Sequence, residues 1–236
     1  MPDFSARSNE IEIMDDLRCT GQVLDQTLRE LEFINKWLGG NKITINAIDQ
    51  LLKNTNTSEI TIVDLGCGGG DMLKIIDAWG KRKKLKLKLT GVDANPYIVD
   101  FAKKNLKDYP HIHFETMDIF SEEFQQRKYD IVVGTLFYHH FSSTELTDFF
   151  KRLRQQVSIG YVVNDLHRHW LAYYSIKLLT QIFSKSSMVK YDAPLSVLRA
   201  FKKEELKQII MGSQPIEFEL RWKWAFRWQV VAKMKV

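Results

Sequence analysis

The sequence predicts an α/β fold built on a doubly wound, mostly parallel sheet of seven strands. From residue 60 onward, short apolar runs rich in β-branched residues alternate with helical stretches of roughly ten to fifteen residues. A glycine-rich turn follows the first run, and two extended runs at 216–222 and 224–231 close the chain with no helix between them. Strands that alternate with helices form βαβ units, whose parallel sheet is covered on both faces.

The N-terminal part of the chain, 1–53, is expected to form a helical cap. Apolar residues recur at three- and four-residue spacings over 8–38, which indicates a long amphipathic helix. The pair Gly39–Gly40 is expected to end this helix, because glycine commonly follows a helix C-terminus. A shorter helix is expected over 44–53, and a polar loop at 54–58 leads into the sheet.

The strands and helices of the sheet follow in order. The first strand, at 60–63, leads through the glycine-rich turn into a helix over 72–79. Further parallel strands are expected at 87–92, 112–115, 129–134 and 161–163. Helices are expected at 97–107, 143–156 and 170–184. The two extended runs at the end predict an antiparallel pair at one edge of the sheet, because a short connection joins antiparallel strands.

The composition is that of one soluble globular domain spanning 1–236. Hydrophobic residues make up 44% and charged residues 27% of the chain, which are ordinary values for such a domain. No apolar run is long enough to span a membrane, and residues 1–5 lack the basic start and apolar stretch of a signal peptide. Cys19 and Cys67 suggest neither a disulfide framework nor a zinc site. We expect a reduced cytoplasmic setting, no metal, no membrane insertion, and either a monomer or a homodimer.

The net charge of +5 is concentrated in a lysine-rich run at 81–88. One interpretation is a patch that binds nucleic acid or an anionic membrane. The other is a solvated connection between a helix and a strand, in which Leu85, Leu87 and Leu89 alternate inward. The regular apolar alternation favours the second interpretation.

The glycine-rich turn discriminates between two classes of cofactor. Its sequence is Asp64-Leu65-Gly66-Cys67-Gly68-Gly69-Gly70-Asp71. A dinucleotide-binding turn requires G-x-G-x-x-G, so that the pyrophosphate can reach the helix N-terminus. Here Asp71 replaces the last glycine, and Asp64 would repel a pyrophosphate. These acids favour a ligand with a cationic amino group and no phosphate, as in the methionine end of S-adenosylmethionine (SAM).

Two further acids follow the next two strands. Asp93 ends the second strand and can accept hydrogen bonds from both ribose hydroxyls. Asp118 follows the third strand and can accept from an adenine amino group, while Ile119 can pack on the ring. Because the carboxyl ends of parallel strands meet at one edge of the sheet, these acids together predict an adenosyl-binding site.

With these motifs, the segment 60–141 resembles the class I SAM-dependent methyltransferases. The glycine-rich turn, Asp93 and Asp118 stand at the family's cofactor positions, and 129–141 is similar to its fourth-strand motif. The resemblance implies SAM as cofactor and S-adenosylhomocysteine (SAH) as product. The cofactor-binding residues that it implies are Asp64, Gly66, Cys67, Gly68, Gly70, Asp93, Ala94, Asn95, Asp118, Ile119 and Thr135.

Segments outside this core resemble a bacterial subgroup of small-molecule methyltransferases. They are Met14–Asp16, Ile34–Gly40, Asn164–His169 and Asp192–Arg199. Predicted members of this subgroup tailor polyketides, phenols or pigments. The resemblance therefore implies a small-molecule acceptor and no nucleic acid.

Ionisable residues after the fourth and fifth strands are the candidates for acceptor chemistry. His139 or His140 could remove a proton from an acceptor hydroxyl, or one of them could cap the next helix. His167 or Asp165 could likewise face the acceptor, with Arg168 binding an acidic or phenolate group, or this segment could form a hydrogen-bonded turn. The residues predicted to contact the acceptor are Asn164, Arg168 and Tyr173.

The segment 167–200 is expected to be a helical insertion. Its first helix is rich in aromatic and aliphatic residues. With the N-terminal helices it could form a lid over an apolar acceptor pocket, or it could pack in the core.

These observations predict methyl transfer from SAM to a hydroxyl of an aromatic or polyketide-derived small molecule. An RNA- or protein-directed methyltransferase would use the same fold, but the fourth strand lacks the Asn/Asp-Pro-Pro-aromatic motif expected for attack by a base amine. An NAD(P)-dependent oxidoreductase is disfavoured by Asp64 and Asp71. A non-catalytic SAM-binding subunit would leave the polar cluster at 164–169 without a purpose. The acceptor atom, whether oxygen, nitrogen or carbon, stays open.

Overall fold

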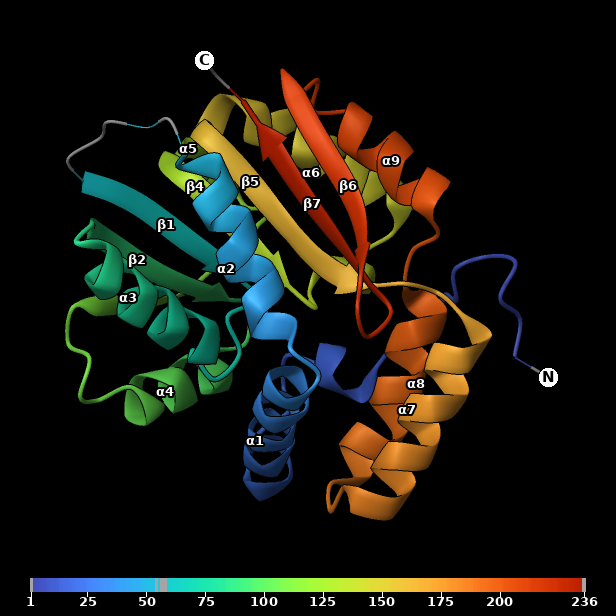
Figure 1. The fold of residues 1–236 in the computed structure, drawn as a ribbon. Helices are drawn as coiled ribbons and strands as arrows, with labels where there is room; N and C mark the ends of the chain where they lie inside the picture. The colour runs from blue at the N-terminus through green and yellow to red at the C-terminus, as the bar shows by residue number, and fades with distance from the viewer. Residues whose placement is uncertain (1, 54, 56–58, 235–236) are drawn as a thin grey trace.

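Seven strands of the described residues form one sheet in the order β3-β2-β1-β4-β5-β7-β6 (Figure 1). The computed structural model describes residues 2–53, 55 and 59–234. The strands are β1 Glu59–Leu65, β2 Lys86–Asp93, β3 Ile112–Thr116, β4 Tyr129–Thr135, β5 Val157–Leu166, β6 Glu217–Lys223 and β7 Arg227–Lys233. Pairing is parallel from β3 to β5, while β7 is antiparallel to both β5 and β6. The predicted fold class and the antiparallel C-terminal pair are confirmed.

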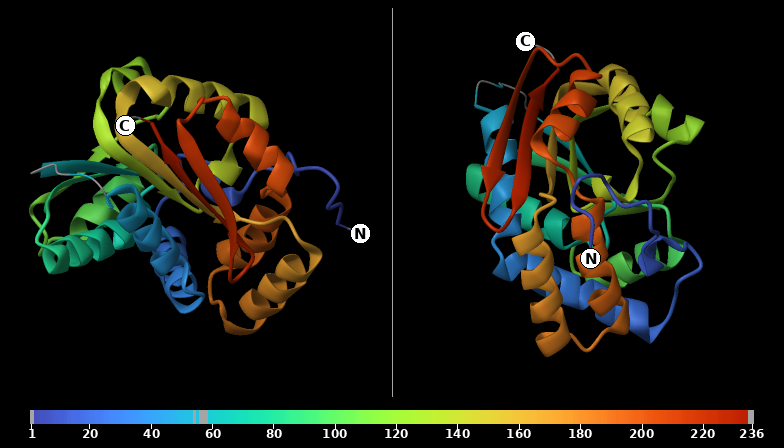
Figure 2. Two further views of the ribbon diagram at one scale, coloured as in Figure 1. Left: turned by 45° about the horizontal axis from the view of Figure 1, so that its top comes forward. Right: turned by 90° about the vertical axis from the view of Figure 1, so that its right-hand side faces the viewer.

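Helices cover both faces of this sheet (Figure 2). The longer helices are α1 Gln22–Trp37, α2 Gly40–Leu51, α3 Asp71–Lys83, α4 Pro96–Asn105, α6 Ser143–Gln156, α7 Trp170–Phe183, α8 Ser187–Arg199 and α9 Lys203–Met211. Shorter ones are α5 Glu122–Gln126 and two 3₁₀ turns, η1 Ile13–Asp15 and η2 Tyr138–His140. Buried residues of α2, α3 and α4 form one apolar core with the sheet, and those of α5, α6 and α9 form another. The sheet is therefore doubly wound, and its central strands are buried on both sides.

The predicted continuous helix over 8–38 is wrong. Only η1 and α1 are helical there, and the chain between them is not. The N–H groups of Ile13 and Met14 donate to the carboxylate of Asp192 at 2.8 and 3.1 Å, so tertiary contacts satisfy them. Gly21 adopts a φ of 85°, which breaks the helical path before α1. Residues 8–21 therefore cross α8 as a mostly non-helical segment, which is called the N-terminal strap below.

Other predicted boundaries differ less. The second helix starts at Gly40, directly after α1, because Gly39 takes a left-handed φ of 75° and caps α2. The helical insertion contains two antiparallel-packed helices, α7 and α8, and the short helices α5 and α9 were not predicted. The predicted loop at 54–58 lies outside the described residues except for Thr55.

The lysine-rich run forms the solvated connection between α3 and β2. Lys81, Lys83 and Lys88 each pair with a carboxylate at 2.6–2.8 Å, and Leu85 and Leu87 pack against the apolar core. These contacts support the second interpretation of the run. Among the described residues, the helices are all too short or too polar to cross a membrane.

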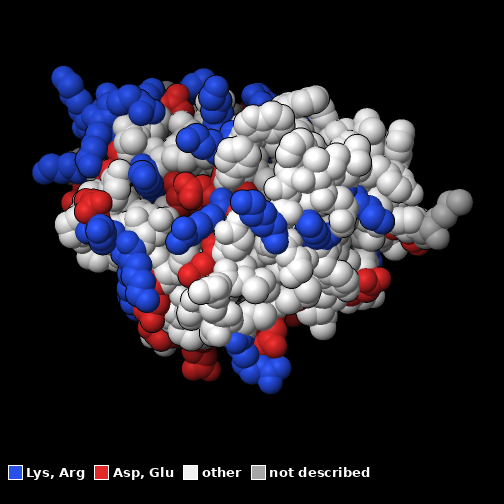
Figure 3. All heavy atoms as spheres, turned by 90° about the horizontal axis from the view of Figure 1, so that it is seen from below, with Lys and Arg blue, Asp and Glu red and all other residues white. Residues whose placement is uncertain are grey.

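Three helices project beyond the carboxyl edge of the parallel strands. Figure 1 shows α1, α7 and α8 together below the sheet, and contacts join α8 to both of the others. Seen from below, charged side chains gather over the half that carries α3 and α4, and few lie over α7 (Figure 3). Leu178, Ile182 and Phe183 of α7 are exposed, so this helix is not a core helix. Other residues of α7 line one side of the cavity that is described below.

Close packing of β5 against β7 predicts a strong effect of Gly160→Ala. A Cβ at Gly160 would lie 2.3 Å from the backbone oxygen of Ala232 and 2.7 Å from Leu51 Cδ2. We expect this variant to lose about 1–3 kcal/mol of unfolding free energy, measured by urea denaturation. Lys86→Ala, at an exposed position of β2, is the control and should change it by less than about 0.5 kcal/mol. Equal stability of the two variants would contradict the strand register.

Candidate active site

A cavity of about 390 Å³ lies between the carboxyl edge of the sheet and the helices α1, α7 and α8. The glycine-rich turn after β1 and the end of β4 form its floor. Residues of α1, α7 and α8, together with 224–227 at the tip of the β6–β7 hairpin, complete its walls. Ligands of doubly wound folds bind at this edge of the sheet, so the cavity is the candidate site.

The glycine-rich turn brings its backbone to the cavity. Gly66, Cys67 and Gly68 line it, whereas Gly70 lies behind them as the N-cap of α3. Gly66 has a φ of 62°, and a Cβ there would lie 2.1 Å from the ring of Phe137. Only glycine allows this close approach of backbone and aromatic ring.

The cavity wall at this turn is acidic. Asp64 and Asp71 line it, and neither forms an ion pair with a basic side chain of the described residues. Burial, together with Asp71 and Asp93, raises the pKa of Asp64 well above its usual range. Burial and the charge of Glu32 raise the pKa of Asp71 to about 6. Carboxylates without a basic partner, such as the buried Asp64 and the half-buried Asp71, stabilise a cationic ligand, and the amino group and sulfonium of SAM fit this wall.

The predicted residues after β2 lie just outside the cavity. Asp93 accepts hydrogen bonds from the backbone N–H groups of Gly68 at 3.4 Å and Asn95 at 3.0 Å. Burial raises the pKa of Asp93, and these hydrogen bonds oppose the rise. Asn95 caps α4 through Tyr97 N at 2.9 Å, so its side chain serves the fold. Ala94 lies between them.

The predicted adenine residues also lie beyond the cavity. Asp118 is exposed and accepts from the backbone N–H of Phe120 at 2.9 Å. Ile119 is buried in the core on the α6 face, so its side chain is not available to a ring. Thr135, by contrast, lines the cavity and shares a 2.9 Å hydrogen bond with Thr44 of α2.

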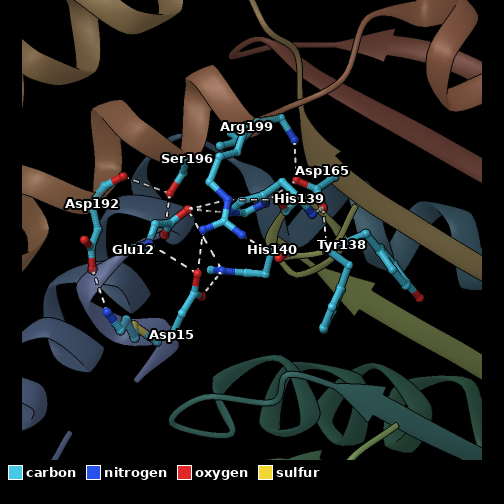
Figure 4. Close-up of polar contacts among 12 residues, drawn as sticks. Glu12, Asp15, Tyr138, His139, His140, Asp165, Asp192, Ser196 and Arg199 are labelled. Carbon is cyan, nitrogen blue, oxygen red and sulfur yellow. Dashed lines mark hydrogen bonds and ion pairs between the residues drawn. The ribbon is translucent and has the colours of Figure 1, made fainter. Parts of the chain in front are cut away.

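His139 lies on the cavity wall and is held there by Asp165 (Figure 4). The Asp165 carboxylate is fully buried and accepts from His139 Nδ1 at 2.7 Å and from the backbone N–H of Tyr138 at 2.8 Å. Burial alone would raise its pKa, but the charge and hydrogen bond of His139 lower it. Because an ionised carboxylate only accepts, the neutral form of the His139 ring carries its proton on Nδ1 and its lone pair on Nε2.

Glu12 faces the other side of His139 and was missed by sequence reasoning. Its Oε1 atom lies 3.7 Å from His139 Nε2 and has no hydrogen-bond partner among the described residues, while Oε2 accepts from Ser196 at 2.9 Å. Burial raises the pKa of Glu12 to about 7. No motif marks this residue in the sequence, because the N-terminal strap brings it to the site from 127 positions away.

His140 also lines the cavity, and a carboxylate binds its Nδ1 as Asp165 binds that of His139. Its Nδ1 lies 2.6 Å from Asp15 Oδ1, and Arg199 binds the other oxygen of Asp15. Burial alone would raise the pKa of Asp15, but His140 and Arg199 bring it to about 2. Arg199 also donates to the carbonyl groups of His139 and His140, which fixes η2.

Glu12, His139 and His140 offer metal-ligating atoms within 4.8 Å of one another. The Arg199 guanidinium lies 3.8 Å from Glu12 Oε1 in the same cluster. Its positive charge disfavours a divalent cation at this place. The expectation of no metal stays a prediction.

Three of the residues predicted to meet the acceptor are placed elsewhere. Asn164 is buried beneath the cavity, where its amide donates to Gly40 O at 2.9 Å and Thr44 Oγ1 at 3.0 Å. Tyr173 is half-buried and packs edge-on against Phe4, with ring centroids 5.7 Å apart. His167 packs on Trp228, and burial lowers its pKa to about 4. These side chains do not line the cavity, so the predicted roles are corrected.

Arg168 is a structural residue and does not line the cavity. Its guanidinium is fully buried and binds Glu205 at 2.6 and 3.0 Å, together with the carbonyl oxygens of Ser5 and Ala200. The prediction that it binds an acidic acceptor is wrong, because these partners already use its donors. Another arginine, Arg227 on β7, lines the cavity and was not predicted.

The central part of the chain is similar to known methyltransferases. Residues 62–160 match the family described as "Methyltransferase domain". An 89-residue stretch is 34% identical to the putative methyltransferase 235L of Invertebrate iridescent virus 6, covering 38% of this chain and 29% of that protein. A 98-residue stretch is 26% identical to malonyl-(acyl-carrier protein) O-methyltransferase of Acetivibrio thermocellus, covering 41% and 32%. The chain thus spans less than a third of the length of either curated relative.

Comparison with solved structures finds a similar fold over nearly the whole chain. Human N-acetylserotonin methyltransferase, solved in complex with SAM, matches with a TM-score of 0.66 at 17% identity, over 99% of this chain and 61% of that chain. At this identity the likeness establishes the fold. It confirms the doubly wound sheet predicted from the sequence.

The raised pKa of Glu12 predicts a pH-dependent stability. Its protonated form is favoured in the folded state, so its contribution is full below about pH 4.5 and is lost as the pH rises through about 7. Glu12→Gln lacks this loss and should gain stability over the wild type between about pH 5 and pH 8, by at most about 3 kcal/mol. Urea denaturation at both pH values measures the difference.

Glu10→Gln, at an exposed position of the same strap, is the matched control and should follow the wild-type profile. Parallel pH profiles for Glu12→Gln and the wild type would show that Glu12 is ionised in the folded protein throughout this range.

Proposed function

We propose that this protein transfers the methyl group of SAM to a small-molecule acceptor bound in the cavity. Two observations support the proposal: the match of residues 62–160 to the methyltransferase domain, and the unpaired carboxylates of the glycine-rich turn. The turn lies at the same edge of the sheet as His139, so cofactor and acceptor can meet within one cavity.

The acidic wall is the proposed cofactor side. Asp64 and Asp71 would hold the amino group, and Asp93 and Asp118 follow the strands where the ribose and adenine would lie. When bound there, SAM supplies an electrophilic methyl group on a positively charged sulfur. Two carboxylates near a sulfonium also stabilise the ground state, so the rate must come from how the chain positions and deprotonates the acceptor.

The single observation that carries the acceptor chemistry is the pairing of His139 with Asp165. His139 lines the cavity, and its Nε2, which has no hydrogen-bond partner among the described residues, would accept the proton of an acceptor hydroxyl. Asp165 holds the imidazole in the required tautomer and balances the charge that the ring gains. Glu12, 3.7 Å from the same nitrogen, would add a second negative charge beside the imidazolium when its carboxyl group is ionised.

The walls of the cavity favour an aromatic or polyketide-derived acceptor. Apolar side chains of three helices line it, namely Leu28, Leu31, Ile34, Ile176, Leu179, Val189 and Val197. Trp224 and Phe226 also line it at the hairpin tip. Apolar walls with a few convergent polar groups are typical of sites for small ligands. The proposed reaction is therefore O-methylation of a hydroxyl on such a molecule.

The cofactor assignment predicts selective binding of adenosyl ligands. Calorimetric titration should show micromolar binding of SAM and SAH and none of NADH, because the acidic wall repels a pyrophosphate. Asp93→Ala should weaken SAH binding about tenfold or more, through lost charge-assisted hydrogen bonds. Asp100→Ala, an exposed carboxylate on α4, is the control and should bind as the wild type does. NADH binding in place of SAH would overturn the proposal.

The acceptor chemistry predicts different effects of alanine substitution at His139 and at His167. His139→Ala should lower turnover on phenolic acceptors by about a hundredfold or more while SAH affinity stays within about twofold. Asp165→Asn should cost a similar factor, because the imidazole can take the wrong tautomer. A screen that detects SAH release measures both.

His167→Ala is the control in this series, since His167 lies outside the cavity. It should keep full turnover. Wild-type turnover of His139→Ala on an accepted substrate would exclude His139 as the base.

A further inference from the structure

Arg227 differs from the other buried arginines of the described residues. Arg168 binds the carboxylate of Glu205, and Arg199 binds that of Asp15. Arg227 is 2% exposed, yet it forms no ion pair within 4.0 Å among the residues that the structure describes. Its contact with Asn164 Oδ1 is long, at 3.4 Å, and its Nε has no hydrogen-bond partner there. A buried charge without a partner is costly and indicates a ligand.

The positive charge of Arg227 lies on the β5–β7 side of the cavity, away from the glycine-rich turn where the cofactor would bind. It begins β7 and pairs with Leu166 at the end of β5, whereas the glycine-rich turn follows β1 on the other side of β4. Burial lowers its pKa to about 10, and the charge of Asp165, the partner of His139, opposes that change. Arg227 is therefore charged at neutral pH and acts on the His139 side of the cavity.

Aromatic and polar residues line the cavity near Arg227. The cavity wall next to it is made by Trp224 and Phe226 of the hairpin tip and by Asn35 of α1. Asn35 Oδ1 is also buried without a partner among the described residues. A Cβ at Gly40 would lie 2.0 Å from Asn35 Oδ1 and 2.8 Å from Arg227 Cζ, so glycine keeps this corner open.

We propose that Arg227 binds a carboxylate of the acceptor, so that the acceptor is an aromatic or polyketide-derived acid that also carries a hydroxyl. A guanidinium offers parallel N–H donors that match a carboxylate, which fixes orientation as well as charge. The acid end would bind at the β7 side, and the hydroxyl would lie toward His139. The position of the hydroxyl near His139 rests on the proposed function, whereas the binding of the carboxylate rests on Arg227 alone.

Matched pairs of an acid and its amide test the inference. The probes are para-hydroxybenzoate with para-hydroxybenzamide, and para-hydroxycinnamate with its amide, titrated calorimetrically with and without SAH. The wild type should bind each acid at least about tenfold more tightly than its amide, because only the acid pairs with the guanidinium. Equal affinities for acid and amide would overturn the inference without any variant.

Variants of Arg227 test whether its guanidinium causes the preference for the acid over the amide. R227Q should abolish the preference for the acid, R227K should keep part of it, and both should bind SAH as the wild type does. R221Q, at a largely exposed position of the same hairpin where Arg221 pairs with Glu219, is the matched control and should keep the full preference. If R227Q instead weakens SAH and spares the acids, the guanidinium serves the cofactor carboxylate and the inference is wrong.

Thermal unfolding separates ligand binding from a structural role. Removal of an unpaired buried charge should leave the melting temperature of R227M equal to that of the wild type or above it. A fall of more than about 5 °C would assign Arg227 to the fold and overturn the inference. Failure of the wild type to bind SAH would defeat the proposed function, while the acid and amide titrations without SAH would still decide the inference.

Discussion

The carboxylate of Asp165, buried at the end of β5, connects the fold to the site. Its oxygens accept hydrogen bonds from the backbone of Tyr138, His139 and Leu166 and from the imidazole of His139. The same charge therefore holds η2 against the sheet edge and orients the ring that lines the cavity. Loss of this carboxylate would leave buried N–H groups unpaired, so fold and chemistry depend on it together.

Charges of opposite sign line different parts of the cavity. Carboxylates without basic partners lie at the glycine-rich turn, and a guanidinium without an acidic partner lies at the hairpin tip, with the His139–Asp165 pair on the wall. Burial destabilises an unpaired charge at either place. A cationic cofactor and an anionic acceptor, bound at opposite ends, would satisfy both. The complementary charges would also fix the orientation of each bound molecule.

Prediction from the sequence succeeded where local pattern and tertiary environment agree. The β-branched runs that became β1, β4 and β5 are buried on both faces, so their continuous apolar character was informative. Prediction failed over 8–38, where an apolar periodicity was present but Asp192 of α8 captured the N–H groups of Ile13 and Met14. Helical periodicity does not reveal a long-range hydrogen-bond partner, and that partner decided the local structure.

The sequence by itself determined the doubly wound sheet, its antiparallel edge pair and the acidic glycine-rich turn, because each depends on residues adjacent in the chain. It also indicated that His139 or His140 would reach the site, since both directly follow β4. Only the tertiary structure showed that each has a carboxylate at Nδ1, Asp165 for His139 and Asp15 for His140, and only it placed Arg227 rather than Arg168 in the cavity. Both arginines lie at strand ends, and partners distant in the sequence decide whether a guanidinium is paired with an acid or left open to a ligand.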